Sequence, residues 1–310
     1  MQSRRKFIKE AGLAALSTLL LSKTSVFGNA LAYPKNHAVG LQLFTFFGLI
    51  DDDVQGTLKK ISEVGFLEIE SAFSRKGAYY GLSPKDFSKT IQDLGMSWKS
   101  HHALGAPFKL PPGAKMPLGA DGKPIVIPTV LNLKENMQQI VDEVAEGGIE
   151  FLVCANTPIH TLSEIDSSIE VLNKTGEACK KAGLKFAYHN HDAEFKAVEG
   201  KIPYDLFISG LDSKNVLFEL DLAWAIKGGA DPVSLFKSNP GRFPLWHLKD
   251  LDATHNQVLP VGEGTLHFEP IFEAAKIAGM KHFFVEHDMP KDALASIKSS
   301  FAYVNQKLKV

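Results

Sequence analysis

The sequence predicts a single (β/α)8 barrel, the TIM-barrel fold of the α/β class. From Ala38 onward, eight short apolar runs alternate with amphipathic stretches. Eight βα units in about 270 residues are the number of units and the length expected of a TIM barrel. A doubly wound sheet usually carries a glycine-rich phosphate loop after its first strand. Here the first strand runs instead into Gln42-Leu43-Phe44-Thr45-Phe46, which favours the barrel.

The strands are predicted from their length, their apolar character and the polar residue that ends most of them. In chain order they are Ala38–Phe44, Phe66–Glu70, Ser97–His101, Glu150–Cys154, Lys185–His189, Val216–Asp221, Leu245–Lys249 and His282–Glu286. Each is expected to be followed by a helix that packs on the outside of the barrel.

Local signals predict where the helices begin and end. Ser83-Pro84 and Asp231-Pro232 place a capping side chain before a proline at the first helical position. Thr161-Leu162-Ser163-Glu164 is a capping box. A buried helix face follows from the spacing of Met137, Ile140, Val141, Val144 and Ala145. Glycines that turn the chain from a helix end toward the next strand are Gly65, Gly95, Gly148, Gly183 and Gly279.

One connection, residues 102–131, is much longer than the others. It holds Pro107, Pro111, Pro112, Pro117, Pro124 and Pro128. Loops above roughly 15 residues are uncommon in compact domains and often cover a site. Because it follows the third strand, it is expected to be a lid over the C-terminal face of the barrel, and the alternative is a passive insertion.

Residues 1–32 are interpreted as an export signal that precedes a barrel domain of residues 33–310. Ser3-Arg4-Arg5-Lys6-Phe7-Ile8-Lys9 matches a twin-arginine signal, and an apolar run and Ala30-Leu31-Ala32 follow it. The apolar run is shorter than the roughly 20 residues that span a bilayer. The mature protein is therefore expected to be periplasmic, or otherwise extracytoplasmic, without a stable membrane anchor.

The charge argues against a nucleic-acid partner, and the cysteine content argues against stabilisation by disulfides. The formal net charge is −1, from 34 Lys+Arg against 35 Asp+Glu, and only two cysteines are present, Cys154 and Cys179. Without a basic stretch, a nucleic-acid partner is not expected. Two cysteines do not make a disulfide framework.

Polar side chains collect at the carboxyl ends of the predicted strands. These ends surround the mouth where TIM-barrel enzymes keep their active sites. Imidazole and carboxylate groups from successive strands can converge on one cation, and this donor set suits Mn, Zn, Fe or Co. The residues in question are Gln42, Glu70, His101, His102, His189, Asn190, His191, Asp221, His247, Lys249, Asp250 and Glu286.

Five stretches also match a known family. They are Tyr188–Phe195 (YHNHDAEF), Glu219–Trp224 (ELDLAW), His247–Asp250 (HLKD), Val261–Gly264 (VGEG) and Val285–Asp288 (VEHD). In these stretches the sequence resembles the sugar phosphate isomerase/epimerase group of the xylose-isomerase-like TIM barrels. That group also contains inosose dehydratases, tagatose and psicose 3-epimerases and the endonuclease IV type of DNA-repair enzyme.

The resemblance implies one divalent metal ion (Mn, Zn, Co, Fe or Mg). In the family its ligands are a Glu on the fifth strand, an Asp on the sixth, a His on the seventh and a Glu on the eighth. Asp221, His247 and Glu286 match this pattern. The fifth strand departs from it, because His189-Asn190-His191 stands where relatives have Glu-Asn-His. The ligand role at that position is therefore assigned to His189.

Glu286 is expected to be both a metal ligand and the catalytic base. The missing glutamate leaves the second acid or base open, with Lys249 and His191 ahead of Glu70 and His101. Lys249 lies two residues beyond a ligand, and a nearby cation would lower its pKa. The structural alternative is that Lys249 pairs with Asp250.

Substrate contacts are predicted for Gln42, Glu70, His101, Trp224 and Glu263. Trp224 could stack on a sugar ring or pack in the core. Glu263, between two glycines, could reach a sugar hydroxyl or be an ordinary turn residue.

The sequence thus predicts a metal-dependent isomerase or epimerase of a sugar or keto-sugar that acts by proton abstraction next to a carbonyl. Export and the lack of an arginine cluster argue for a non-phosphorylated substrate. The alternatives are a lyase or dehydratase of a keto-sugar or inosose, and a non-catalytic sugar-binding barrel. A DNA-repair endonuclease would need more metal ligands, a basic groove and an intracellular address. The sugar, the metal and a homo-oligomeric state stay open.

Overall fold

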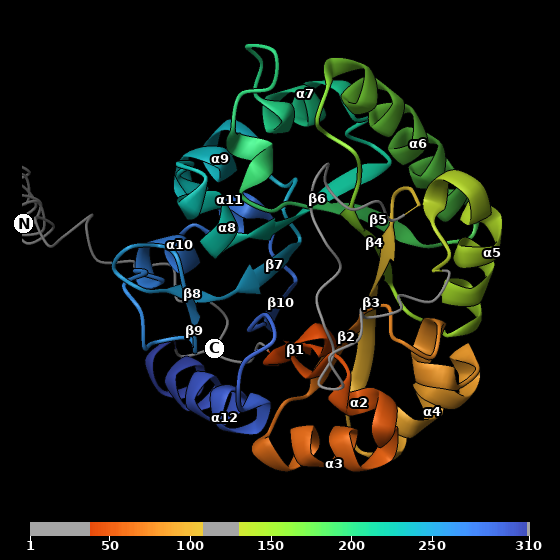
Figure 1. The fold of residues 1–310 in the computed structure, drawn as a ribbon, viewed down its shortest axis with the longest axis vertical. Coiled ribbons are helices and arrows are strands. Elements are labelled where there is room, and N and C mark those ends of the chain that lie inside the picture. Colours follow the sequence, from red (N-terminus) through yellow and green to blue (C-terminus); the bar gives the residue numbers. More distant parts are fainter. Residues whose placement is uncertain (1–37, 108–129, 309–310) are drawn as a thin grey trace, which may run out of the picture. The chain divides into compact units, whose positions relative to one another are not determined.

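The structure, a computed structural model, describes residues 38–107 and 130–308, and these have the predicted fold. Eight parallel strands close into one barrel in the order β1-β2-β3-β4-β5-β6-β7-β10, and β10 pairs with β1. The helices surround the barrel on its outside (Figure 1). The expected signal (1–32) and residues 108–129 of the expected lid lie outside the described residues. In the described part, no helix is long and apolar enough to cross a membrane.

The observed strands agree with the predicted ones to within a few residues at each end. Two match completely, β5 and β6, whereas β1 is shorter and β3 extends three residues beyond His101. The barrel strands are β1 Gly40–Gln42, β2 Glu68–Ser71, β3 Ser97–Leu104, β4 Phe151–Asn156, β5 Lys185–His189, β6 Val216–Asp221, β7 Leu245–Leu248 and β10 His282–Val285. A two-stranded antiparallel ribbon that was not predicted lies outside the barrel and consists of β8 Asp250–Leu251 and β9 Val258–Leu259.

The predicted helix caps are confirmed. Ser83 and Asp231 accept hydrogen bonds from the first turns of α4 and α9, and Thr161 accepts one from Glu164 N at the start of α6. The α-helices are α2 Leu49–Asp52, α3 Val54–Val64, α4 Pro84–Asp93, α5 Leu133–Glu146, α6 Leu162–Lys181, α7 Pro203–Gly210, α8 Leu222–Lys227, α9 Pro232–Ser238, α10 Glu269–Glu273, α11 Ala275–Ala278 and α12 Ala293–Tyr303. Shorter 3-10 turns are η1 Leu43–Phe46, η2 Ala78–Gly81 and η3 Ala193–Phe195, and η4 Val304–Leu308 is a π-helix.

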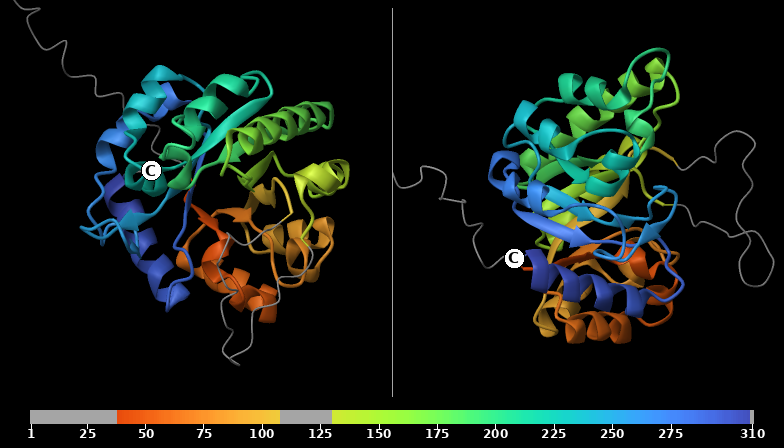
Figure 2. Two further views of the ribbon diagram at one scale, coloured as in Figure 1. Left: turned by 45° about the horizontal axis from the view of Figure 1, so that its top comes forward. Right: turned by 90° about the vertical axis from the view of Figure 1, so that its left-hand side faces the viewer.

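The first and last long helices close the ring around the barrel. Helix α3 (orange) and helix α12 (blue) lie side by side in the views of Figures 1 and 2. Gly65 ends α3 with φ 115°, and a Cβ there would meet the ring of Phe301 on α12. The rings of Phe66 and Phe301 lie 5.1 Å apart. Aromatic packing therefore joins the two ends of the described chain.

The barrel interior changes from apolar to polar along the strands. A fully buried apolar layer contains Ala187, Leu245 and Phe284, together with Phe151 and Val153. Side chains two residues apart on a strand point to the same face. The next inward residues on these three strands are His189, His247 and Glu286, so the polar groups lie directly above the apolar layer, toward the C-terminal mouth.

Candidate metal centre and active site

Three of the four predicted metal ligands come together at the C-terminal end of the barrel. These three residues, Asp221, His247 and Glu286, are called the outer group below. Strand register places Asp221 level with His247. His247 Nδ1 lies 2.7 Å from Glu286 Oε2 and 4.0 Å from Asp221 Oδ2. Their potential ligand atoms all lie within 4.8 Å of one another, and all three residues are buried.

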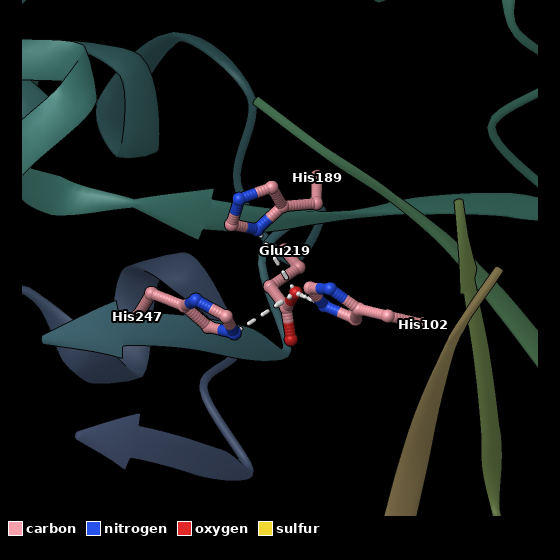
Figure 3. A group of neighbouring side chains, drawn as sticks. All are labelled: His102, His189, Glu219 and His247. Carbon is pink, nitrogen blue, oxygen red and sulfur yellow. Dashed lines mark hydrogen bonds and ion pairs between the residues drawn. The ribbon is translucent and has the colours of Figure 1, made fainter. Parts of the chain in front are cut away.

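His189 is not part of the outer group. Its Nδ1 lies 3.0 Å from Glu219 Oε2, a contact that strand register explains because the two residues are level on β5 and β6. Glu219 also contacts His102 Nε2 at 2.6 Å. His102, His189, Glu219 and His247 thus form a second cluster, the inner group, drawn in Figure 3.

Glu219 was missed as a site residue by the sequence argument, and His102 was noticed only as a polar strand end. A signal for Glu219 existed, because a carboxylate two residues before Asp221 must point to the same face of the strand. Glu219 is fully buried. A search for polar residues at the strand ends does not find Glu219, because it lies two residues before the end of its strand.

Gln42 and Glu70 hold the cluster from within the protein rather than lining an open mouth. Both are fully buried. Glu70 Oε1 lies 2.8 Å from Gln42 Nε2 and 2.5 Å from His247 Nε2, and Glu70 Oε2 accepts a hydrogen bond from Ser100. Direct substrate contacts of these two residues stay a prediction. What their contacts show is a positioning role, in which Glu70 orients the imidazole of His247, as second carboxylates commonly do for histidine ligands.

His101 points away from the barrel interior, so the structure does not bring this predicted substrate-binding residue to the cluster. Its Nδ1 lies 2.8 Å from Ser71 Oγ, and its ring packs 4.9 Å from Tyr79 and 6.4 Å from Trp98. Burial lowers its pKa to about 3, and the nearby charge of His102 adds to that. His101 is a neutral core histidine, whereas its neighbour His102 faces inward.

Lys249 places an ammonium group beside the two carboxylates of the outer group. Its Nζ lies 3.1 Å from Asp221 Oδ2, 2.8 Å from Glu286 Oε2 and 2.9 Å from Asp288 Oδ2. Burial opposes the charge, but these three carboxylates hold the pKa of Lys249 well above its ordinary value. Lys249 therefore pairs with these three carboxylates and not with Asp250. The lowering of its pKa by a bound cation stays a prediction.

The carboxylate of Glu286 is held on one side only. Burial alone would raise its pKa, yet Lys249 and His247 outweigh burial and hold the pKa well below the ordinary range. Among the described residues, both of these partners contact Oε2. The geometry leaves Oε1 to face another group.

The imidazoles of the inner group differ in charge. Burial disfavours a proton on each ring, but Glu70 and Glu219 face His102 and raise its pKa to about 9. The pKa of His247 also lies well above its ordinary value, because Glu219, Glu70 and Glu286 outweigh burial. Burial and the adjacent imidazoles keep the pKa of His189 well below its ordinary value. His189 is therefore the neutral member.

Trp224 and His191 border the group on the side of α8. The ring of His191 lies 5.0 Å from that of His189 and 6.4 Å from that of Trp224. The ammonium groups of Lys227 and Lys249 lie 4.6 and 5.1 Å from the Trp224 ring centre. Trp224 thus contributes a cation–π contact to the placement of Lys249, and a sugar-stacking role for it stays a prediction.

Glu263 lies apart from both groups. It is exposed, accepts a hydrogen bond from Ser299 on α12, and lines a surface pocket with His287 and Met289. The structure does not bring Glu263 to the cluster, which fits the turn-residue alternative.

Asp250 organises the loop that follows β7. Its carboxylate accepts hydrogen bonds from the backbone amides of Leu251 (2.9 Å), Gly262 (2.9 Å), Gly264 (3.1 Å) and Leu266 (3.0 Å). Four donors on one buried carboxylate explain why Asp250 is unavailable to Lys249.

Replacing Asp250 by alanine is expected to lower the free energy of unfolding by about 1–3 kcal/mol, because amides that lose their acceptor are only partly reached by water. Urea denaturation measures this loss. Asp250→Asn keeps one acceptor oxygen and should lose less. An unchanged urea midpoint for Asp250→Ala would show that the carboxylate does not hold the loop.

The outer group fits a divalent metal ion. It combines one imidazole with two carboxylates, a donor set that suits Mn, Zn, Fe or Co. Asp221 is fully buried, and burial raises its pKa in spite of Lys249 and His247. A further positive charge beside Asp221 would therefore be stabilising.

A comparison of the sequence with models of known protein families finds a match over most of the chain. Residues 58–306 match the model of the family described as Xylose isomerase-like TIM barrel. An inosose dehydratase of Geobacillus thermodenitrificans (strain NG80-2) is 26% identical over 168 residues, which cover 49% of this chain and 56% of the relative. One from Geobacillus kaustophilus (strain HTA426) is 29% identical over 139 residues, 39% of this chain and 44% of the relative. The chain spans about half the length of the curated relatives it matches.

Solved structures match over more of the chain. A sugar phosphate isomerase/epimerase from Parabacteroides distasonis ATCC 8503 is 27% identical, with a TM-score of 0.70 over 89% of this chain and 96% of that chain. An L-ribulose 3-epimerase is 16% identical, with a TM-score of 0.62 over 87% of this chain and 94% of that chain. The latter likeness is one of fold.

Proposed function

Because the chain belongs to the xylose isomerase-like TIM barrel family, we propose that it is a divalent-metal-dependent isomerase or epimerase of a non-phosphorylated sugar or keto-sugar. The observation that supports this most directly is the outer group, where Asp221, His247 and Glu286 meet the ammonium of Lys249 at the mouth of the barrel. Relatives named as inosose dehydratase and as sugar phosphate isomerase/epimerase support a sugar substrate.

The proposal that the sugar is not phosphorylated draws on the arginines. Two arginines lie in the described part of the chain, and each is engaged elsewhere. Arg75 pairs with Asp51, and Arg242 donates to the Val216 carbonyl at the start of β6. Neither contacts the outer or inner group. Bidentate phosphate binding usually relies on arginine.

In this proposal Asp221, His247 and Glu286 hold the metal ion, and a ligand role for His189 stays a prediction. The bound ion would supply polarisation of a substrate carbonyl or hydroxyl, which acidifies the adjacent C–H bond. Glu70 keeps the His247 ring in place through its contact at Nε2.

Glu286 is proposed as the base. Its Oε2 is anchored by His247 and Lys249, so Oε1 is the atom that accepts the substrate proton. A carboxylate with a lowered pKa is a weak base, and it therefore depends on a strongly acidified substrate proton. Lys249 is protonated, so its role is to donate a proton or to stabilise negative charge on a substrate oxygen. His191, partly exposed beside His189, is the remaining candidate for the second acid or base.

A dehydratase is the second candidate, because the curated relatives are inosose dehydratases. Proton abstraction by Glu286 would be the same. The difference is that a hydroxyl leaves, and the protonated Lys249 is placed to give it a proton.

Export is proposed from the sequence alone. Residues 1–32 would form a twin-arginine signal and residues 33–310 the mature barrel in the periplasm. Detection of a mature chain that begins after Ala32 in the periplasmic fraction would support this.

The metal-loaded protein is expected to exchange a substrate C–H proton for deuterium in heavy water. A panel of keto-sugars and inososes is incubated with the protein and followed by NMR, which also separates epimers from dehydrated products. Removing the metal with a chelator should stop the exchange. Lack of exchange with every substrate that binds would favour a non-catalytic sugar-binding barrel.

A further inference from the structure

The inner group is a convergence of three imidazoles on one carboxylate oxygen. Glu219 Oε2 lies 2.6 Å from His102 Nε2, 3.0 Å from His189 Nδ1 and 3.2 Å from His247 Nε2. The four residues come from β3, β5, β6 and β7, and Figure 3 shows the three imidazole rings arranged around the carboxylate of Glu219. All four are buried, with their potential ligand atoms within 4.8 Å of one another.

The rings are held in place by packing. The imidazoles of His102 and His247 are stacked, 5.2 Å apart and with 1° between their planes. His189 lies 5.0 Å from the first ring and 4.5 Å from the second. Donors that already converge on rigid strands need little rearrangement to bind an ion.

Charge in this interior is unbalanced. Glu70, Glu219, Asp221 and Glu286 are buried, and Asp288 is half-buried. The ammonium of Lys249 contacts Asp221, Glu286 and Asp288. Glu70 and Glu219 are contacted instead by the imidazoles of His102 and His247. Even with both of these imidazoles protonated, the five carboxylates outnumber the three cationic groups by two, so negative charge is still in excess. Buried charges that are not compensated are strongly unfavourable.

Glu219 also has a free donor atom. Its Oε1 is buried, and none of the described residues gives it a hydrogen-bond partner. Buried polar atoms are nearly always partnered. One oxygen of the Glu219 carboxylate thus contacts three imidazoles, and the other has no partner among the described residues. A bound cation would provide a partner for this second oxygen.

We propose that the inner group is a second metal site, which binds a divalent transition-metal ion such as zinc, cobalt or iron through His102, His189 and Glu219. Two imidazoles and one carboxylate form a set known for catalytic zinc and non-haem iron sites. His247 is not needed as a ligand here, because its Nδ1 faces the outer group. Magnesium and calcium prefer oxygen ligands and do not suit this site.

Titration of the metal-free full chain with Co²⁺ tests the proposal. Equivalents bound are counted by visible absorption and by elemental analysis after desalting. The wild-type protein should bind two equivalents. Glu219→Gln and His102→Gln should each bind one, as should Asp221→Asn, which removes the other ion. The double variant Asp221→Asn/Glu219→Gln should bind none.

The control is His282→Gln, which breaks a pair with Glu68 at the opposite end of the barrel and should keep two equivalents. Circular dichroism checks each fold, and if one inner variant does not fold, the other decides. If the wild-type protein binds one equivalent of Co²⁺, and this is lost in Asp221→Asn but kept in Glu219→Gln, the inner site is overturned and the proposed function is left intact. If one equivalent is bound, and it is lost in Glu219→Gln but kept in Asp221→Asn, the inner site is supported and the proposed outer ligands are overturned. No uptake of Co²⁺ would overturn both.

Discussion

Replacing Glu286 by glutamine is expected to abolish exchange of the substrate proton with solvent, with a loss of roughly 10²–10⁴-fold. The amide has nearly the shape of the carboxylate and can still place an oxygen toward His247 and Lys249. It cannot accept a proton at the position of Oε1. Deuterium incorporation in heavy water measures the rate, and elemental analysis of the same sample should show that part of the metal is retained.

The control for this variant is Glu150→Gln, which removes a carboxylate that pairs with Lys185 at the N-terminal end of the barrel. It should exchange at the parent rate. If Glu286→Gln itself exchanges at the parent rate, the base lies elsewhere, and Lys249 and His191 are the next residues to replace. That outcome would change the mechanism and leave the fold and the metal site unaffected.

Replacing Asp221 by alanine is expected to remove the ion that Asp221, His247 and Glu286 are proposed to share. The variant loses a ligand outright, so affinity should fall by more than the roughly 10–100-fold typical of changes to residues that only orient a ligand. It also takes one of three carboxylates from Lys249. His247→Ala should behave in the same way. Calorimetric titration with Zn²⁺ and metal analysis measure the loss.

Asp205→Ala is the matched control, because Asp205 is an exposed aspartate at the start of α7. Its metal content should equal that of the parent. Full occupancy in both Asp221→Ala and His247→Ala would refute the ligand assignment, even if activity were lost.

The order and the boundaries of the elements were predictable because they depend on local interactions. Ser83, Thr161 and Asp231 cap their helices through side chains that lie next to them in sequence. The end of β1 was less predictable. Gln42 accepts a hydrogen bond from Phe44 N and begins the 3-10 turn η1, whereas the apolar run in the sequence continues to Phe44.

The face to which a histidine points was harder to predict. His101 and His102 are both polar residues near the end of an apolar strand, so the pattern alone did not distinguish them. The β2–β3 pairing shifts its register between Ile69 and Glu70. A register shift is a property of how two strands pair, so neither strand's own sequence pattern reveals it. It accompanies the placement of Ser100 against Glu70 and of His101 against Ser71.

Local sequence was therefore sufficient for the barrel, the helix caps and the location of polar groups at the mouth. Only the closed barrel decided which of those groups meet. His189 lies 58 residues from His247 in the chain, and their separation depends on how β5, β6 and β7 pair. The same holds for the pKa of Lys249, which three carboxylates on different segments raise. Pairing between distant strands sets these distances, and electrostatic interactions in a buried site depend strongly on distance.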